Sequence, residues 1–129
     1  MRLDVTCAIV IKEGKVLATQ RSEEMNLPLK WEFPGGKIDA NESDQECVLR
    51  EIKEELNIDI EILKKLANQP FDYFELKINL IPFIAKYLSG EITLTEHKDY
   101  KWLTKAELRF LDWAPADIPV LNEFLKVDL

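Results

Sequence analysis

The chain has 129 residues, of which 47% are hydrophobic, and this is enough apolar material for a single domain with a buried core over residues 1–129. The formal net charge of −7 argues against a protein that binds nucleic-acid polymers, because such proteins need a basic surface. The two cysteines form no disulfide framework, and no apolar run is long enough to cross a membrane. We therefore expect a cytoplasmic protein without a membrane partner.

The first half of the chain predicts a hairpin followed by a loop and a short strand. A strand over residues 2–11 turns at Glu13-Gly14 and returns over residues 16–21. A polar loop over residues 22–30 leads to a short strand at Trp31-Glu32-Phe33, which we expect to end at Pro34-Gly35-Gly36. Further strands are predicted over residues 58–66, 71–76, 78–88 and 101–103.

Three helices are predicted from their capping residues. Ser43 and Glu46 form a capping box before the central helix, and Asn57 suits a left-handed position at its end. Thr104 with Glu107 begins a short second helix, and the last helix runs over residues 117–126. The apolar stripe expected on the central helix comprises Val48, Leu49, Ile52 and Leu56. Mixed strands with these helices indicate an α+β fold, an α/β/α sandwich.

The central helix also predicts an acidic face. Glu51, Glu54 and Glu55 are spaced i, i+3 and i+4, so they share one side of the helix. Like charges at this spacing repel one another, and Mg²⁺ or Mn²⁺ would turn the repulsion into binding. Arg50 stands beside this face and can orient a glutamate. The alternative is a solvated helix face with no ligand.

The spacing of these residues resembles the signature of the Nudix hydrolases. Gly36 is followed after five residues by Glu42, and after seven more by Arg50-Glu51-Ile52-Lys53-Glu54-Glu55. Asn57 stands where the Nudix box has a second glycine, and asparagine tolerates the same backbone conformation. The resemblance implies the Nudix fold, with a mixed β-sheet between helices and the box as a loop–helix–loop.

Stretches outside the box resemble the MutT-type nucleoside triphosphate pyrophosphohydrolases. These are Trp31–Lys37, Arg21 and Ala114–Leu121. At Asp117 the 8-oxo-dGTP hydrolases carry Asn, whereas the CTP pyrophosphohydrolases carry Asp within a nearly identical Ala-Pro-Ala-Asp-Ile-Pro. Glu96, six residues before Trp102, matches a loop glutamate that joins the metal site in MutT-type enzymes.

The resemblance implies that water attacks the β-phosphorus of a nucleoside triphosphate, giving the monophosphate and pyrophosphate. The implied metal ligands for Mg²⁺ or Mn²⁺ are the Gly35 carbonyl, Glu51, Glu54, Glu55 and Glu96. Either Glu51 or Glu96 would accept the proton of the attacking water, and Arg50 would support the catalytic glutamates. The implied substrate-binding residues are Arg21, Phe33, Lys37 for phosphate and Asp117 for the base.

Asp117 carries the expectation about the base. An ionised aspartate only accepts hydrogen bonds, so it suits an exocyclic amino group such as N4 of cytosine. Cytosine nucleotides, including modified ones, therefore stand above 8-oxo-dGTP as the expected substrate, and the latter remains the alternative. A role for Asp117 as a helix cap is equally open to this residue type.

Several other residues also have a purely structural interpretation. Arg21 is as compatible with an ion pair at the sheet edge as with a substrate contact, and Phe33 with a place in the core. His97 is expected to be a loop residue and Cys47 a residue without a metal or redox role. The alternatives of other classes are a non-catalytic nucleotide-binding module and a Nudix hydrolase of other diphosphates. We expect a monomer or a weak dimer that acts on a small nucleotide.

Overall fold

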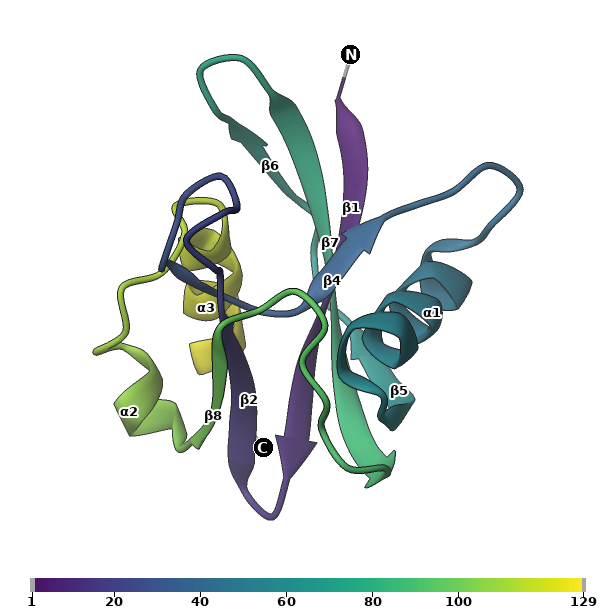
Figure 1. The fold of residues 1–129 in the computed structure, drawn as a ribbon, viewed down its shortest axis with the longest axis vertical. Helices are drawn as coiled ribbons and strands as arrows, with labels where there is room; N and C mark the ends of the chain where they lie inside the picture. Colours follow the sequence, from purple (N-terminus) through teal and green to yellow (C-terminus); the bar gives the residue numbers. More distant parts are fainter. Residues whose placement is uncertain (1, 129) are drawn as a thin grey trace.

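A computed structural model describes residues 2–128, and it consists of one mixed β-sheet with helices on both sides (Figure 1). The strands are β1 (Leu3–Lys12), β2 (Lys15–Gln20), β3 (Trp31–Glu32), β4 (Gly35–Lys37), β5 (Asp59–Lys65), β6 (Gln69–Asp72), β7 (Lys77–Ser89) and β8 (Asp99–Leu103). The helices are α1 (Asp44–Leu56), α2 (Lys105–Leu108) and α3 (Asp117–Leu125). The predicted α+β sandwich is confirmed.

The sheet has the order β3-β2-β1-β7-β5, and β4, β6 and β8 pair with β1, β7 and β2 respectively. The β1–β7 pair is parallel, whereas the other pairs are antiparallel. Strand β1 changes its partner along its length: Ile11 and Lys12 pair with β2, whereas residues 5–7 pair with β4. This change brings the segment that joins β3 to β4 across the middle of β1, where Ala8 N–H donates to the Pro34 carbonyl.

Side chains alternate between two hydrophobic cores, one on each face of the sheet. Cys7 and Ile9 of β1 face the core that contains Phe124 of α3. Ala8 and Val10 face the core that contains Ile52 of α1. A strand covered by helices on both faces reads as a continuous apolar run, and this explains why the central part of β1 shows no polar alternation.

The apolar face of α1 differs from the prediction at one position. Val48, Ile52 and Leu56 are buried as expected, but Leu49 is 41% exposed and Cys47 is fully buried in its place. Leu49 lies about 100° further around the helix than Val48, which turns it away from the sheet.

Strand β3 ends before Pro34 as predicted, but the strand that follows it was not predicted. Residues 35–37 form β4, in which Thr6 pairs with Gly36 and Cys7 pairs with Gly35. A Cβ atom at Gly35 would lie 2.0 Å from the Thr6 carbonyl oxygen. Glycine is therefore required by the close approach of two backbones within a sheet.

The predicted strand over residues 71–76 was also partly wrong, because the chain turns after Asp72. The backbones of Tyr73 and Leu76 exchange two hydrogen bonds that close the β6–β7 hairpin. Phe74 at its tip is fully exposed, so the apolar side chains here do not mark a strand. Strand β8 begins at Asp99, two residues earlier than predicted.

The end of α1 confirms the expectation for Asn57. Its φ and ψ are 60° and 34°, in the left-handed region, and its N–H donates to the Lys53 carbonyl at 3.0 Å. Asparagine adopts this conformation more readily than other residues with a side chain. Asn57 therefore ends the helix in the same backbone conformation that the glycine of the signature would adopt.

Replacing Asn57 by valine is expected to lower the free energy of unfolding by about 1–2 kcal/mol, because a β-branched side chain is strained in this conformation. Asn57→Gly should keep the wild-type value within about 1 kcal/mol. Urea denaturation of the three proteins checks this. Equal stabilities of the valine and glycine variants would contradict it.

Candidate active site

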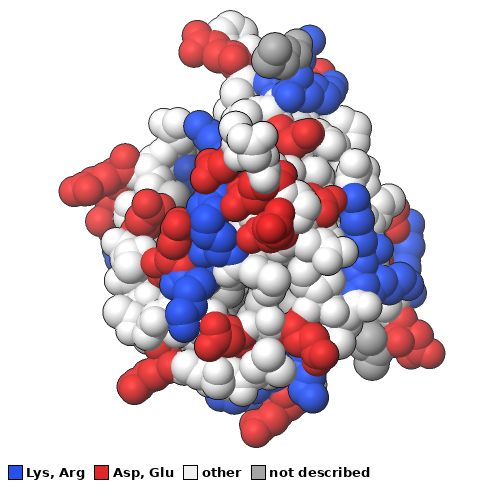
Figure 2. Space-filling view, turned by 90° about the vertical axis from the view of Figure 1, so that its right-hand side faces the viewer, with Lys and Arg blue, Asp and Glu red and all other residues white. Residues whose placement is uncertain are grey.

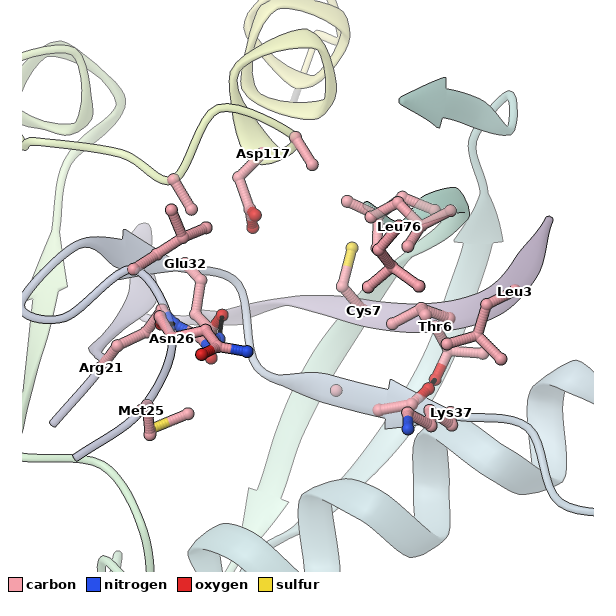
Figure 3. A pocket seen from close by; sticks show the side chains of 18 of the residues that line it. Leu3, Thr6, Cys7, Arg21, Met25, Asn26, Glu32, Lys37, Leu76 and Asp117 are labelled. Atoms are coloured by element: carbon pink, nitrogen blue, oxygen red, sulfur yellow. Dashed lines mark hydrogen bonds and ion pairs between the residues drawn. The ribbon is translucent and has the colours of Figure 1, made fainter. Parts of the chain in front are cut away.

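The acidic face of α1, the centre of the sheet and the N-terminus of α3 meet around one pocket of about 870 Å³ (Figure 3). Its floor includes Cys7 of β1, and one wall carries Asp117 of α3. Of the residues predicted for the site, the pocket is lined by Arg21, Phe33, Gly35, Lys37, Glu51, Glu55, Glu96 and Asp117. Residues distant in the sequence thus reach a single cavity.

Helix α1 is held against β4 by hydrogen bonds near its first turn. The Ser43 capping box with Glu46 is present as predicted. Cys47 Sγ contacts Thr6 Oγ1 at 3.2 Å and the Lys37 carbonyl at 3.3 Å. Burial raises the pKa of the Cys47 thiol, so this residue keeps its proton and acts in packing.

The absence of a side chain at Gly36 makes room for Glu51. A Cβ atom at this position would lie 2.3 Å from Cδ of Glu51 and 2.4 Å from its Oε2. The glycine of the motif and its first helical glutamate are therefore a matched pair. This contact explains why the two residues occur in one sequence pattern.

Arg50 binds four carboxylates, of which those of Asp39 and Glu51 line the pocket. It donates to Glu42 from Nε at 2.6 Å, to Glu51 at 2.9 Å and to Glu54 at 3.1 Å, and it lies 3.4 Å from Asp39. Hydrogen bonding to Arg50 lowers the pKa of Glu42 to about 2. Arg50 thus orients Glu51 and Glu54, as the sequence suggested for one glutamate.

Glu55 is the most strongly perturbed acid of the helix. Its Oε2 is buried and has no hydrogen-bond partner among the described residues. Burial, and then the charges of Glu51, Glu32 and Glu96, raise the pKa of Glu55 to about 9. A carboxylate in this position is stabilised by any cation that reaches it.

Glu54 and Glu96 stand at the edges of this arrangement. Glu54 is exposed and lies outside the pocket lining, beside Arg50. Glu96 is exposed on the loop between β7 and β8, whose Thr95 donates to the Glu55 carbonyl. Within residues 2–128, no three acidic, histidine or cysteine side chains converge closely enough to surround a metal ion unaided. The side chains of Glu51 and Glu54 turn toward Arg50 instead.

Asp117 is buried and does not cap α3, so the capping interpretation was wrong. The N-cap residue is Ala116, and Asp117 Oδ2 instead accepts from the backbone N–H of Phe33 at 2.9 Å. Burial, and then the charge of Glu32, raise the pKa of Asp117 well above its usual range, against the hydrogen bond from Phe33. In Figure 3 the carboxyl group points into the pocket.

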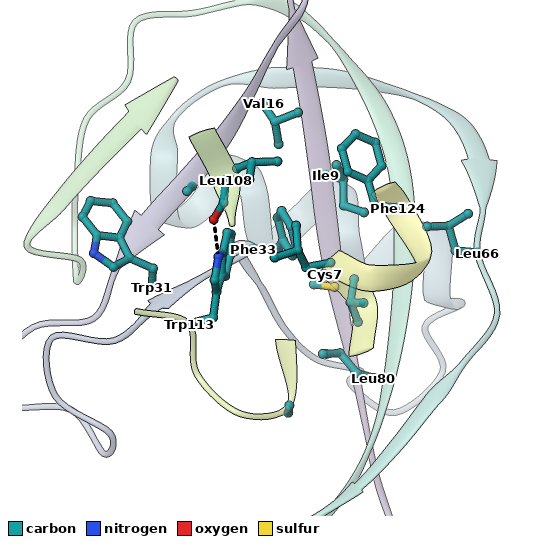
Figure 4. Close-up of a cluster of buried hydrophobic side chains, with 14 of the residues drawn as sticks. Cys7, Ile9, Val16, Trp31, Phe33, Leu66, Leu80, Leu108, Trp113 and Phe124 are labelled. Carbon is teal, nitrogen blue, oxygen red and sulfur yellow. Dashed lines mark hydrogen bonds between the residues drawn. The ribbon is translucent and has the colours of Figure 1, made fainter. Parts of the chain in front are cut away.

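The aromatic residues behind Asp117 belong mainly to the core. The rings of Phe33 and Trp113 lie 4.6 Å apart, and Trp113 Nε1 donates to the Leu108 carbonyl (Figure 4). The Phe33 side chain is buried, although the residue also lines the pocket. Trp31 is buried as well, with the Lys101 ammonium 5.1 Å from its ring centre.

Glu32 lines the pocket, and no role was predicted for it from the sequence. Its Oε1 accepts from Arg21 at 2.8 Å, and its Oε2 lies 2.8 Å from Nε2 of His97. Arg21 therefore makes the ion pair that was one of its two interpretations, while it also lines the pocket. The available signal was the alternation of the strand, which turns Glu32 away from Trp31 and Phe33.

The arrangement of sheet, helix and acidic cluster agrees with the comparison of the whole chain with known proteins. The NUDIX domain model matches residues 1–124. The chain belongs to the Nudix family. It is a hydrolase of this family, and the fold expected from the motif is confirmed.

This Nudix hydrolase is similar to two enzymes from Escherichia coli (strain K12). One is the CTP pyrophosphohydrolase, 31% identical over 97% of this chain and 93% of that protein. The other is the 8-oxo-dGTP diphosphatase, 26% identical over 98% of each chain. The solution structure of the DNA mismatch repair protein MutT from methicillin-resistant Staphylococcus aureus 252 is 40% identical, with a TM-score of 0.77 over 97% of this chain and 98% of that one.

The surface of the Nudix domain shows no basic face on the side that carries α1. There, acidic and basic side chains are interspersed (Figure 2). None of the helices within residues 2–128 is long and apolar enough to cross a membrane.

The raised pKa of Glu55 gives a stability prediction. An unfolded chain loses this proton near pH 4.5 and the folded chain near pH 9, so the free energy of unfolding falls as pH rises between these values. Without divalent ions, Glu55→Gln should therefore raise Tm by about 3 °C or more at pH 8 and by less at pH 5. Thermal denaturation followed by circular dichroism checks this.

Magnesium provides the control for the same pair of proteins. Mg²⁺ should raise Tm of the wild type at pH 8 more than that of Glu55→Gln, because it binds only the folded carboxylate. A Glu55→Gln variant that is less stable than the wild type at both pH values would contradict the description of this residue.

The contact between Gly36 and Glu51 gives a second prediction. Gly36→Ala should lower hydrolytic turnover by roughly 100-fold, because the new Cβ displaces the Glu51 carboxylate. Gly14→Ala is the matched control, since a Cβ there meets no atom within 4 Å but its φ is +76°. It should lower Tm and leave turnover unchanged. A fall in turnover for Gly14→Ala, with wild-type turnover for Gly36→Ala, would show that the space beside Gly36 does not affect catalysis.

Proposed function

We propose that this Nudix hydrolase is a nucleoside triphosphate pyrophosphohydrolase that uses Mg²⁺ or Mn²⁺ and releases the monophosphate and pyrophosphate. The observation that carries the proposal is one acid-rich pocket of about 870 Å³, a volume typical of sites that hold small ligands. The acidic residues in its lining are Glu32, Asp39, Glu51, Glu55, Glu75, Glu96 and Asp117, whereas the basic ones are Arg21 and Lys37. Such a pocket repels a free triphosphate and accepts one that carries divalent cations.

The residues proposed to hold the ions are the Gly35 carbonyl, Glu51, Glu54, Glu55 and Glu96. Bound ions would neutralise the phosphate oxygens and activate water for attack. The unpartnered Oε2 of Glu55 and the exposed carboxylate of Glu96 support this set, because both are available to a cation. Lys37 is exposed at the edge of the pocket and is proposed to contact phosphate.

Glu96 is our candidate for the group that accepts the proton of the attacking water. Burial raises the pKa of Glu51, against the hydrogen bond that it accepts from Arg50 at 2.9 Å, but this same hydrogen bond leaves its carboxylate less free to face the attacking water. Within residues 2–128 we find no hydrogen bond to the Glu96 side chain, so its carboxylate is available. Arg50 then serves catalysis by holding Glu51 and Glu54 in place.

Asp117 supports cytosine as the base that the pocket reads. Oδ2 is committed to the Phe33 N–H, so Oδ1 remains for the substrate. An ionised carboxylate can accept from the exocyclic N4 amino group of cytosine. The match to a CTP pyrophosphohydrolase favours the same assignment. The proposed substrates are therefore CTP, dCTP and their modified forms, with a role in cleaning the nucleotide pool.

Oxidised guanine nucleotides are the second candidate, and one observation favours them. The raised pKa of Asp117 lets this residue keep a proton to higher pH than usual. A protonated carboxyl group offers a donor as well as an acceptor, as asparagine does, and so suits the mixed edge of 8-oxoguanine. The relatedness to an 8-oxo-dGTP diphosphatase agrees with this candidate.

The test is release of pyrophosphate with Mg²⁺ from CTP, dCTP, 5-methyl-dCTP, 8-oxo-dGTP, dGTP, ATP and ADP-ribose. We expect kcat/KM for the cytosine nucleotides to exceed that for 8-oxo-dGTP by at least about tenfold. Asp117→Asn should reduce this ratio, because it replaces an acceptor by a mixed donor and acceptor. Glu54→Gln should lower turnover of every substrate, with Glu61→Gln on exposed β5 as a matched control.

Each alternative function has its own outcome in this panel. A preference for 8-oxo-dGTP, decreasing as pH rises, would replace cytosine by oxidised guanine as the base. Faster turnover of ADP-ribose than of any triphosphate would overturn the triphosphate assignment. Binding of nucleotides without turnover by the wild type would show a non-catalytic module.

A further inference from the structure

His97 is a buried residue whose place in the site was not predicted. It directly follows Glu96 on the loop between β7 and β8, and its side chain is only 1% exposed. It does not line the pocket. Any effect of His97 on the reaction must therefore pass through another residue.

The bonding of His97 is one-sided. Nε2 lies 2.8 Å from Glu32 Oε2, and because a carboxylate only accepts, Nε2 carries the proton. Nδ1 is buried without a hydrogen-bond partner among the described residues. An apolar side chain would fill the same space without this unpaired atom. The residue type is thus explained by the hydrogen bond to Glu32 rather than by packing.

The rest of the loop is tied down on both sides of Glu96. Thr93 and Thr95 donate from their backbone N–H groups to the carbonyls of Leu56 and Glu55, at 3.0 and 3.3 Å. Lys98 N–H donates to the Gln20 carbonyl at 2.9 Å. Between these anchors the side chain of His97 is the connection from the loop to the pocket wall.

Glu32 is itself a fixed acceptor. Its second oxygen accepts from Arg21 at 2.8 Å, and Arg21 follows directly after β2. The chain of contacts Arg21–Glu32–His97 therefore joins the end of the hairpin to the loop that carries Glu96. Glu96 and Glu55 line the same pocket, and the N–H of Thr95, next to Glu96, donates to the Glu55 carbonyl at 3.3 Å, so the two residues lie near each other. The contribution of Glu96 to the raised pKa of Glu55 agrees with this.

We propose that His97 is a positioning residue: its hydrogen bond to Glu32 holds the loop so that the Glu96 carboxylate stays beside Glu55. This inference rests on the proposed role of Glu96 in hydrolysis. It assigns Glu32 a role as the fixed acceptor that connects the pocket to the loop between β7 and β8.

The kinetic test compares His97→Leu with His97→Gln, each in the wild type and in the Glu96→Gln background, with CTP as substrate. Leucine fills the space without a donor, whereas the glutamine amide can still donate to Glu32. His97→Leu should lower kcat by about tenfold or more and leave KM within about twofold. His97→Gln should recover most of the loss. In the Glu96→Gln background, His97→Leu should cost less than about twofold, because the two residues act as one unit.

Hydrogen exchange provides a readout that does not depend on turnover. In His97→Leu the amides of Thr95 and Lys98 should exchange faster than in the wild type, while those of α1 remain protected. His97→Gln should resemble the wild type. This comparison is informative even for a protein that hydrolyses no triphosphate, so it separates failure of the inference from failure of the proposed function.

Three results would overturn the inference. One is unchanged exchange at Thr95 and Lys98 in His97→Leu. Another is a loss of kcat that is fully additive with Glu96→Gln. The third is a Glu96→Gln variant with wild-type turnover, which would leave His97 nothing to position even if Glu54→Gln abolishes hydrolysis.

Discussion

Repulsion between carboxylates that the fold forces together is the constraint on which the site depends. Glu55 shares its helix with Glu51, whereas Glu32 comes from a short strand and Glu96 from a loop. The charges of these three residues all raise the pKa of Glu55. Burial makes this repulsion stronger than it would be on a solvated helix. The hydrophobic cores on both faces of the sheet stabilise an arrangement that the charges alone would oppose. A ligand that brings positive charge is the natural partner of such a pocket.

Two devices keep the acids in place without a ligand. Arg50 bridges Glu42, Glu51 and Glu54, and Gly36 leaves the space that Glu51 occupies. Arg21 and His97 hold Glu32 by hydrogen bonds in the same way. The site is thus organised by hydrogen bonds from Arg50, Arg21 and His97 and by one missing side chain. Binding of divalent ions would then require Arg50 to share its carboxylates, which couples the ion site to the conformation of this arginine.

The sequence predicted the parts of the molecule that depend on local rules. The caps at Ser43 and Asn57 are set by residues within one helical turn, and both were confirmed. It was less informative where distant segments meet. Strand β4 exists because the backbone at Gly35 approaches Thr6, a contact between positions 29 residues apart that no local pattern encodes. Glu32 was missed and Asp117 was wrongly allowed a role as a helix cap, because their hydrogen bonds to Arg21, His97 and Phe33 depend on the fold that brings these residues near.

The carboxylates around Glu55 are expected to bind divalent cations together with a triphosphate. Titration of free Mn²⁺ by electron paramagnetic resonance, with and without a non-hydrolysable CTP analogue, tests it most directly. The wild type should bind Mn²⁺, and in the presence of the analogue it should take up more Mn²⁺ than the analogue binds alone. The double variant Glu51→Gln, Glu55→Gln should do neither. Equal uptake of Mn²⁺ by the wild type and the double variant would contradict it.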